Sequence, residues 1–223
     1  MKYTAEELRK IYNEYYTSDT NKWALVDLDK ARKLVRTIHS WINIDLSENA
    51  GKYVLDVGCA QGYISEAFRL QGYSVTGIDY SDMAVEQAKN LFPQCTIIHM
   101  DGLDPNLKQD FDIIFCRGFS GSNTHDLDYI EKLMRKYLPY LKPNGYFIIG
   151  TWTNFSGKET GEETVNWTKE EIVNLMERFS PGVFKIKSYQ YLGILSILKK
   201  LFLRYLLHKP LKENIYILLQ VSG

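Results

Sequence analysis

The order of apolar and polar positions changes character at about residue 52. Before that point the pattern is helical, and residues 4–16 begin with Thr4 and, three residues later, Glu7, the spacing of a capping box. Residues 27–42 place an apolar stripe on one helical face, formed by Leu34, Val35, Ile38, Trp41 and Ile42. Residues 1–50 are therefore expected to form a helical cap that belongs to the same domain as the rest of the chain.

From residue 52 onward, short runs rich in β-branched residues alternate with helical ones. The expected strands cover residues 53–57, 74–79, 96–100, 111–116, 146–152, 184–192 and 214–221. The expected helices cover residues 63–71, 82–92, 126–141 and 168–179. Strands that alternate with helices of this length predict crossover units and a mainly parallel α/β sheet. The strands are apolar on both faces, which indicates helices on both sides of the sheet.

Composition narrows the class of protein without naming a function. The 223 residues suit one domain, and the formal net charge of zero argues against a protein whose main role is to bind nucleic acid. Three separated cysteines form neither a metal pattern nor a disulfide framework, so we expect no metal and a reducing compartment. The polar start and the lack of a long apolar run predict a cytoplasmic chain without a transmembrane segment.

Two short stretches follow the first two expected strands and carry the clearest chemistry. The first, DVGCAQG at residues 56–62, is a turn in which Gly58 and Gly62 permit positive φ and Ala60 stays small. The second strand ends on Asp79, an acid that can accept hydrogen bonds from both hydroxyls of a ribose. The alternative is a plain tight turn followed by a helix-capping acid. The spacing GxxxG, rather than GxGxxG, and the acid Asp56 before it favour a ligand with an ammonium over one with a pyrophosphate.

With these motifs the chain resembles the class I S-adenosylmethionine-dependent methyltransferases over residues 52–152. The family's first motif usually has a glycine where Ala60 stands. The resemblance implies a Rossmann-like, mainly parallel seven-stranded sheet with helices on both faces and the last strand antiparallel. Residues 51–223 would form the methyltransferase core, with a helical insertion at about residues 193–211.

The resemblance also implies which residues bind S-adenosylmethionine and release S-adenosylhomocysteine. Asp56 and the turn would hold the methionine part, Asp79 the ribose, and Asp101 the adenine amino group. The cofactor contacts implied in this way are Asp56, Gly58, Cys59, Ala60, Gly62, Asp79, Tyr80, Met83, Asp101, Gly102 and Cys116.

The acceptor side is expected where the fourth strand ends, in CRGFSGSNTHD at residues 116–126. Arg117 is a candidate for holding a carboxylate or phosphate of the substrate, and His125 is a candidate general base. Alternatively, SNTHD is a loop whose Thr124 or Asp126 caps the next helix. Further candidates for the acceptor pocket are Tyr12, Tyr16, Asn123, Trp152 and Asn154, and Tyr12, Tyr15, Tyr16 and Trp23 are candidates for a lid.

The function predicted from these features is methyl transfer to a small polar, anionic metabolite or sugar derivative, with oxygen favoured as the acceptor atom. Two alternatives stay open: an N-methyltransferase of a small amine and a non-catalytic binding module with this fold. A nicotinamide oxidoreductase is disfavoured by the glycine spacing. For residues 193–211 the alternatives are packing on the chain's own domain, a dimer or pocket cap, and peripheral contact with a membrane surface.

Overall fold

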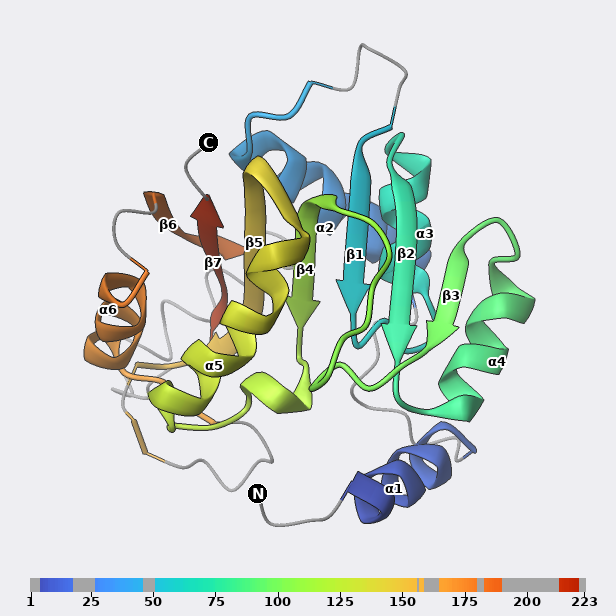
Figure 1. Cartoon of the computed structure of the whole chain (residues 1–223), viewed down its shortest axis with the longest axis horizontal. Helices are drawn as coiled ribbons and strands as arrows, with labels where there is room; N and C mark the ends of the chain where they lie inside the picture. The colour runs from blue at the N-terminus through green and yellow to red at the C-terminus, as the bar shows by residue number, and fades with distance from the viewer. Residues whose placement is uncertain are drawn as a thin grey trace, which may run out of the picture.

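The computed structural model describes residues 5–17, 27–45, 51–155, 157–158, 165–179, 183–189 and 213–220. In this part of the chain, seven strands form one sheet in the order β3-β2-β1-β4-β5-β7-β6 (Figure 1). The strands are β1 (Tyr53–Val57), β2 (Ser74–Asp79), β3 (Thr96–His99), β4 (Phe111–Arg117), β5 (Leu141–Thr153), β6 (Val183–Tyr189) and β7 (Glu213–Gln220).

The first five strands run parallel, whereas β7 pairs antiparallel with both β5 and β6. The expected Rossmann-like class, with a mainly parallel sheet and an antiparallel last strand, is thereby confirmed. β5 begins earlier than the expected residue 146, because Leu141 pairs with Phe111 before the register between β4 and β5 shifts.

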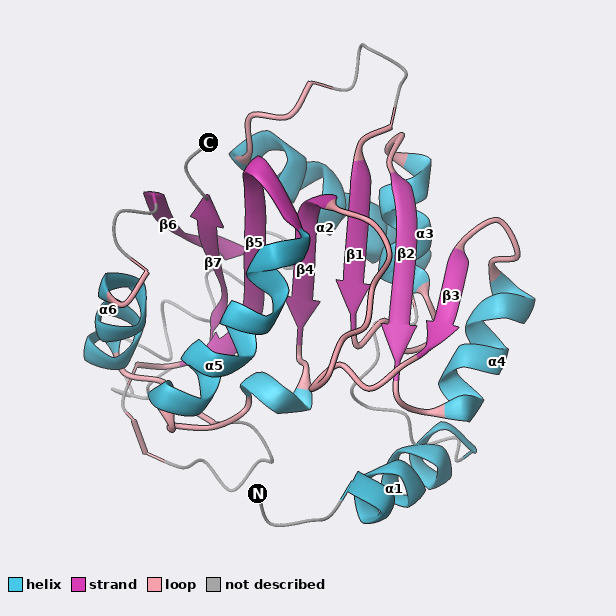
Figure 2. Cartoon of the chain, viewed as in Figure 1, coloured by secondary structure: helices cyan, strands magenta, loops and turns pink. Residues whose placement is uncertain are grey.

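Helices cover both faces of the sheet, as the apolar strands predict (Figure 2). The helices are α1 (Ala5–Thr17), α2 (Leu28–Trp41), α3 (Tyr63–Leu70), α4 (Asp82–Leu91), α5 (Leu127–Tyr137) and α6 (Lys169–Glu177). Successive residues of β4 alternate between two hydrophobic clusters: Ile113 and Phe115 pack with α2 and α3, whereas Ile114 packs with α5 and α6. α4 packs at the β3 edge, where Val85 and Ala88 lie in one cluster with Ile97.

The apolar stripe of the second helix becomes one wall of the core. Leu34, Val35, Ile38 and Ile42 are buried, and Trp41 is half-buried with its ring centroid 5.7 Å from that of Tyr216. Asp27 caps α2, because its side chain accepts a hydrogen bond from the amide of Lys30. Burial of this apolar stripe stabilises the packing of α2 against the sheet, although the helix also carries polar residues.

Several expectations fall on parts of the chain for which the structure gives no description. Thr4 of the expected capping box, Trp23 and the expected helix at residues 193–211 lie outside the described residues. Among the helices within the described ranges, none combines the length and apolarity that crossing a bilayer requires.

The turn after β1 uses the left-handed backbone region at alternate positions. Gly58, Ala60 and Gly62 have φ values of 71°, 50° and 79°. A methyl group on Gly62 would lie 3.2 Å from the Cβ atom of Ala88, tighter than an ordinary contact, so α4 would have to give way by a few tenths of an ångström. Ala60 is strained in backbone conformation, since L-residues rarely occupy this region.

Gly62→Ala is expected to lower the free energy of unfolding by about 2 kcal/mol, because left-handed strain and crowding against α4 add. The matched change in the same turn is Ala60→Gly. It should cost no more than about 0.5 kcal/mol, because relief of strain offsets the greater freedom of glycine in the unfolded chain. Urea denaturation of both variants measures the contrast, and equal destabilisation by the two would contradict it.

Candidate active site

Two adjoining cavities open at the carboxyl ends of the strands, beside the point where the strand order reverses between β1 and β4. Open α/β sheets bind ligands at this place. The larger cavity has a volume of about 220 Å³ and the smaller about 100 Å³. They share a wall made by Tyr12, Tyr16, Gly58, Gly118, Phe119 and Ser120. One elongated ligand can therefore occupy both.

The turn after β1 is fastened to the end of β2. The amides of Gly58 and Cys59 both donate to the carbonyl of Ile78, at 2.9 and 3.0 Å. The amide of Ala60 donates to Oδ2 of Asp79 at 2.9 Å, and the amide of Ser81 donates to Oδ1 of the same carboxylate at 2.9 Å. The acid at the end of β2 thus sets the shape of the turn that lines both cavities.

The smaller cavity is built around Asp79 and the loop after β3. Tyr80, Asp101 and Gly102 also line it. Burial raises the pKa of Asp79, against the backbone amides of Ser81 and Ala60, which lower it. A methyl group on Gly102 would lie 2.9 Å from the ring of Phe119, so only glycine leaves this wall its present shape.

The larger cavity contains a second buried acid, Asp56, at the end of β1. Its side chain is 2% exposed and accepts a hydrogen bond from Oγ of Ser65 at 2.6 Å. Burial raises the pKa of Asp56 to about 7; the bond from Ser65 opposes the rise, the charge of Asp79 adds to it, and Arg117 opposes it. Asp56 therefore gains or loses its charge near neutral pH, depending on what binds beside it.

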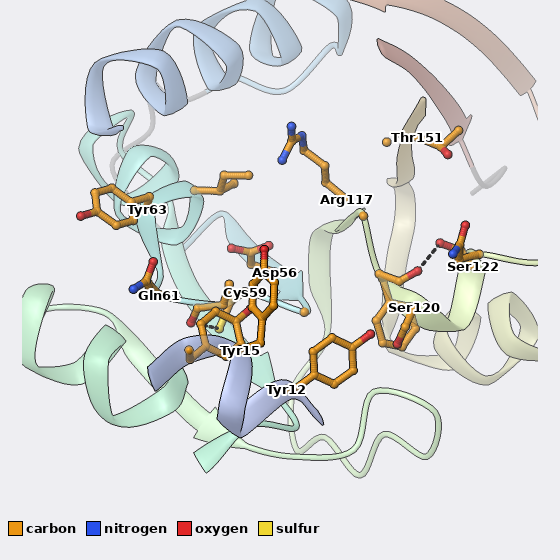
Figure 3. Close-up of a pocket in the computed structure, with 18 of the residues that line it drawn as sticks. Tyr12, Tyr15, Asp56, Cys59, Gln61, Tyr63, Arg117, Ser120, Ser122 and Thr151 are labelled. Carbon is orange, nitrogen blue, oxygen red and sulfur yellow. Dashed lines mark hydrogen bonds between the residues drawn. The ribbon is translucent and has the colours of Figure 1, made fainter. Parts of the chain in front are cut away.

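Arg117, at the end of β4, reaches into the same cavity (Figure 3). Its guanidinium lies over the ring of Trp152, 4.6 Å from the centroid. Gly150 leaves the space along which the arginine extends, since a methyl group there would lie 3.2 Å from its Cγ atom. The structure thus brings together Arg117 and Trp152, as the sequence predicts.

α1 covers the cavities on the side of α4. Asn13 accepts a hydrogen bond from Oγ of Ser81 at 2.6 Å, and the carbonyl of Tyr16 accepts one from Gln87 at 3.0 Å. Tyr12 and Tyr16 line both cavities. Burial, followed by the charge of Asp79, raises the pKa of Tyr16, so its hydroxyl keeps its proton. The structure thus places Tyr12 and Tyr16 at the cavities, and their role as a lid stays a prediction.

His125 has a different environment from the one expected of a base at the reacting centre. Its Nδ1 atom lies 2.5 Å from Oε1 of Glu171, and half-buried His125 is absent from the described lining of both cavities. Asp126 caps α5 by accepting from the amide of Tyr129, and Trp167 donates to the carbonyl of Thr124 at 3.0 Å. The alternative interpretation of SNTHD as a capped loop therefore describes this segment.

Four other predicted residues are absent from the described lining of both cavities. Gly62 packs against Ala88, and Met83 lies half-buried on α4. Cys116 is buried, and burial raises its pKa above the ordinary value, which keeps the thiol neutral. The backbone amide of Asn154 donates a hydrogen bond to Oδ1 of Asn166 at 2.6 Å.

Sequence reasoning missed Phe119, which contacts both ends of the site. Its ring packs over Gly58 and Gly102 and forms part of the shared wall. The one local signal is its position in RGFSG, between two glycines just after a strand. Gln61, Tyr63 and Ile64 also line the larger cavity and were missed, because their approach depends on how α3 leaves the turn.

Comparison with known proteins agrees with this geometry. A family model described as "Methyltransferase domain" matches residues 29–181. A mitochondrial ubiquinone biosynthesis O-methyltransferase of Schizosaccharomyces pombe is 33% identical over 109 residues, which cover 46% of this chain and 38% of that protein. A dTDP-4-amino-2,3,4,6-tetradeoxy-D-glucose N,N-dimethyltransferase of Saccharopolyspora spinosa is 29% identical over 142 residues, or 64% of this chain and 53% of that protein. The chain thus spans about half or less of the length of these relatives.

Solved structures show the same fold at low sequence identity. The N-methyltransferase NodS of Bradyrhizobium japonicum, in complex with S-adenosylhomocysteine, has a TM-score of 0.66 at 15% identity, over 96% of this chain and 98% of that chain. The plantazolicin methyltransferase BpumL has a TM-score of 0.62 at 20% identity, over 98% and 99%. The family model covers more than half of the 223 residues, and the chain therefore belongs to the methyltransferase-domain family.

Proposed function

We propose that this protein binds S-adenosylmethionine across the two cavities and transfers its methyl group to a small polar acceptor. The observation that carries the proposal is the carboxylate of Asp79, which is fixed by two backbone amides and also lines the smaller cavity. A carboxylate held in this way is a preorganised acceptor for the two hydroxyls of a ribose.

The residues of the smaller cavity fit an adenosine. Asp79 would accept from the ribose hydroxyls, and Asp101 would accept from the adenine amino group beside Gly102, with Tyr80 on the same wall. The acids Asp56, Asp79 and Asp101 also disfavour a pyrophosphate, whose negative charge they would repel. This set of side chains fits a nucleoside that carries a positive rather than a negative group.

The residues of the larger cavity fit the amino-acid end and the acceptor. When bound, the cofactor would supply a methyl group on a sulfonium: the methyl carbon bonds to the acceptor as its bond to sulfur breaks, and the neutral thioether S-adenosylhomocysteine leaves. The chain's part is to bind, to align and to exclude water: Asp56 holds an ammonium, while Tyr12 and Tyr16 of α1 cover the junction of the two cavities. These residues contribute by positioning the reactants, and none of them acts as a nucleophile.

Oxygen is favoured as the acceptor atom, and a small amine is the second candidate. The similarity to an O-methyltransferase of ubiquinone biosynthesis supports the first, and the similarity to a sugar N,N-dimethyltransferase supports the second. Ser120, Ser122 and Asn123 line the cavity on the acceptor side and offer hydrogen bonds to either kind of substrate. The same side chains are compatible with a sugar derivative.

Isothermal titration calorimetry with S-adenosylhomocysteine, with NADH as the comparison ligand, tests cofactor binding. Asp79→Asn is expected to weaken the binding of S-adenosylhomocysteine by about 2 kcal/mol, because the ribose hydroxyls lose a charged hydrogen-bond acceptor. Asp29→Asn, which removes an exposed acid of α2 that is absent from the described lining of both cavities, is the matched control and should bind as the wild type does. Equal affinity of the Asp79 variant and the wild type would contradict the placement of the nucleoside.

Asp56 predicts a dependence of cofactor affinity on pH. Because burial raises its pKa to about 7, the carboxyl is mainly neutral at pH 6 and ionised at pH 8. The affinity for S-adenosylhomocysteine should therefore rise by about tenfold from pH 6 to pH 8, as the acid becomes able to attract the ammonium. In Asp56→Asn the affinity should be lower and flat with pH, and a flat profile in the wild type would remove this role.

The raised pKa of Asp56 also affects the stability of the unliganded protein, and here the effect of rising pH is unfavourable. A carboxyl whose pKa is higher in the folded than in the unfolded chain binds its proton more tightly when folded. Asp56 therefore stabilises the fold below its ordinary pKa, and that contribution is lost as the pH rises toward 7. The free energy of unfolding, measured by urea denaturation, should fall more between pH 5 and pH 8 in the wild type than in Asp56→Asn.

His125 is expected to act on the position of the loop rather than on a proton of the substrate. His125→Ala should then lower turnover by less than about tenfold, whereas loss of a general base costs about 10²–10⁴. Glu171→Gln, which weakens the same contact from the other side, should give a similar modest loss. A fall of a hundredfold or more in His125→Ala alone would reinstate the histidine as a base.

A further inference from the structure

The loop after β3 borders the smaller cavity, and hydrogen bonds hold its conformation. Asp101, Gly102 and Leu103 line that cavity. The amide of Leu103 donates to Oδ1 of Asp101 at 2.8 Å, so the backbone of the loop holds one oxygen of the acid. The other oxygen, Oδ2, accepts no hydrogen bond from the described residues, and its lone pairs are left for a ligand.

The peptide unit that holds Asp101 is itself held by α5. The hydroxyl of Tyr137, the last residue of α5, donates to the carbonyl of Gly102 at 2.5 Å. This carbonyl and the amide of Leu103 belong to one planar peptide unit, so the C=O and N–H bonds point in opposite directions. The two hydrogen bonds therefore act in series, as the Tyr137 relay: the hydroxyl of Tyr137 fixes the peptide unit, and the peptide unit fixes the carboxylate of Asp101.

Tyr137 is a rigid support for this relay. It is 1% exposed, and its ring centroid lies 5.9 Å from that of Phe147 in the core cluster beneath α5. Burial raises the pKa of Tyr137, and the charge of Asp101 is among the nearby influences that add to the rise. The hydroxyl therefore keeps its proton and remains a donor to the carbonyl of Gly102.

The neighbouring contact between α5 and the loop is less restrictive. Nζ of Lys136 donates to the carbonyl of Leu103 at 2.7 Å and to Oδ1 of Asp104 at 3.1 Å. The side chain of Lys136 is about half exposed and that of Asp104 is exposed, so water competes for these bonds. The bond from Tyr137 is buried and free of that competition, which makes it the stronger constraint on the loop.

We propose that Tyr137 is a positioning residue for recognition of adenine: through the peptide unit of Gly102 and Leu103, its hydroxyl orients the carboxylate of Asp101 toward the amino group of the base. The inference rests on the proposed function, which places the adenine against Asp101. Tyr137 is absent from the described lining of both cavities, so it acts through Asp101 and not by contact with the cofactor. A carboxylate fixed in this way favours a base that donates a hydrogen bond over one that does not.

The amino group of the base is the probe of the Tyr137 relay. Calorimetry is run on the full chain with S-adenosylhomocysteine and with its 6-deamino analogue, in which hydrogen replaces the amino group. The wild type should bind S-adenosylhomocysteine about 10- to 100-fold more tightly than the analogue, which leaves the charged acceptor without a donor. Tyr137→Phe should weaken S-adenosylhomocysteine by about 5- to 10-fold and change the analogue by less than about twofold, because the hydroxyl serves the contact that the analogue lacks.

Two further variants separate this role from general support of the loop. When added to Asp101→Ala, Tyr137→Phe should cost no further affinity for S-adenosylhomocysteine, because the residue through which it acts is gone. Tyr140→Phe is the matched control, since the hydroxyl of Tyr140 donates to the carbonyl of Pro105 in the same loop at 3.2 Å. This control should leave the preference for the amino group unchanged.

Binding of the analogue shows that each variant is folded. If Tyr137→Phe is unstable in buffer, all the proteins are compared in concentrated sucrose, which favours the folded state.

Three results overturn the inference alone: an unchanged affinity of Tyr137→Phe for S-adenosylhomocysteine, equal weakening of both ligands by this variant, or a further loss when it is added to Asp101→Ala. Equal binding of the two ligands by the wild type would overturn it by removing the amino group from Asp101. Failure of the wild type to bind S-adenosylhomocysteine would instead overturn the proposed function, and the inference with it.

Discussion

The carboxylate of Asp79 is the constraint on which the geometry of the site depends. One of its oxygens accepts from the amide of Ala60 in the turn after β1, and the other accepts from the amide of Ser81 at the start of α4. The carboxylate that lines the smaller cavity therefore also fixes two of the segments around that cavity. A carboxylate oxygen has more than one lone pair, so these bonds leave capacity for a ligand.

Burying the carboxylate of Asp79 costs free energy, but it holds the carboxylate in a fixed position for a ligand. Burial raises the pKa of Asp79, while the amides of Ser81 and Ala60 and the nearby His99 favour its ionised form. The strained φ of 50° at Ala60 follows from the same contact, since this conformation points the amide of Ala60 at the carboxylate. The backbone strain of the turn accompanies a preorganised hydrogen-bond acceptor, which would need no rearrangement to bind a ribose.

The sequence predicts the parts of this site that are local in the chain. Asp56 and Asp79 lie at the ends of β1 and β2, and Gly58 follows β1. The apolar pattern of both strands is unambiguous, so topology determines the place of these residues at one edge of the sheet. His125 could not be placed in this way, because its partner Glu171 lies 46 residues further on, on α6. Phe119 was missed because a ring packed over two glycines leaves no periodic signal.

The position of α1 connects cofactor binding with closure of the site. Oγ of Ser81 donates to Asn13 of α1 and accepts from the amide of Ala84, while the amide of Ser81 is held by Asp79. The N-terminal end of α4 therefore joins Asp79, which lines the smaller cavity, to α1, which lines both cavities. Because Tyr12 and Tyr16 line both cavities, a ligand that spans them must contact α1 along its length. Under the proposed placement of the cofactor, binding of its nucleoside and the packing of α1 favour each other through these shared contacts, and polar side chains of the larger cavity such as Ser120, Ser122 and Thr151 line the space for the acceptor.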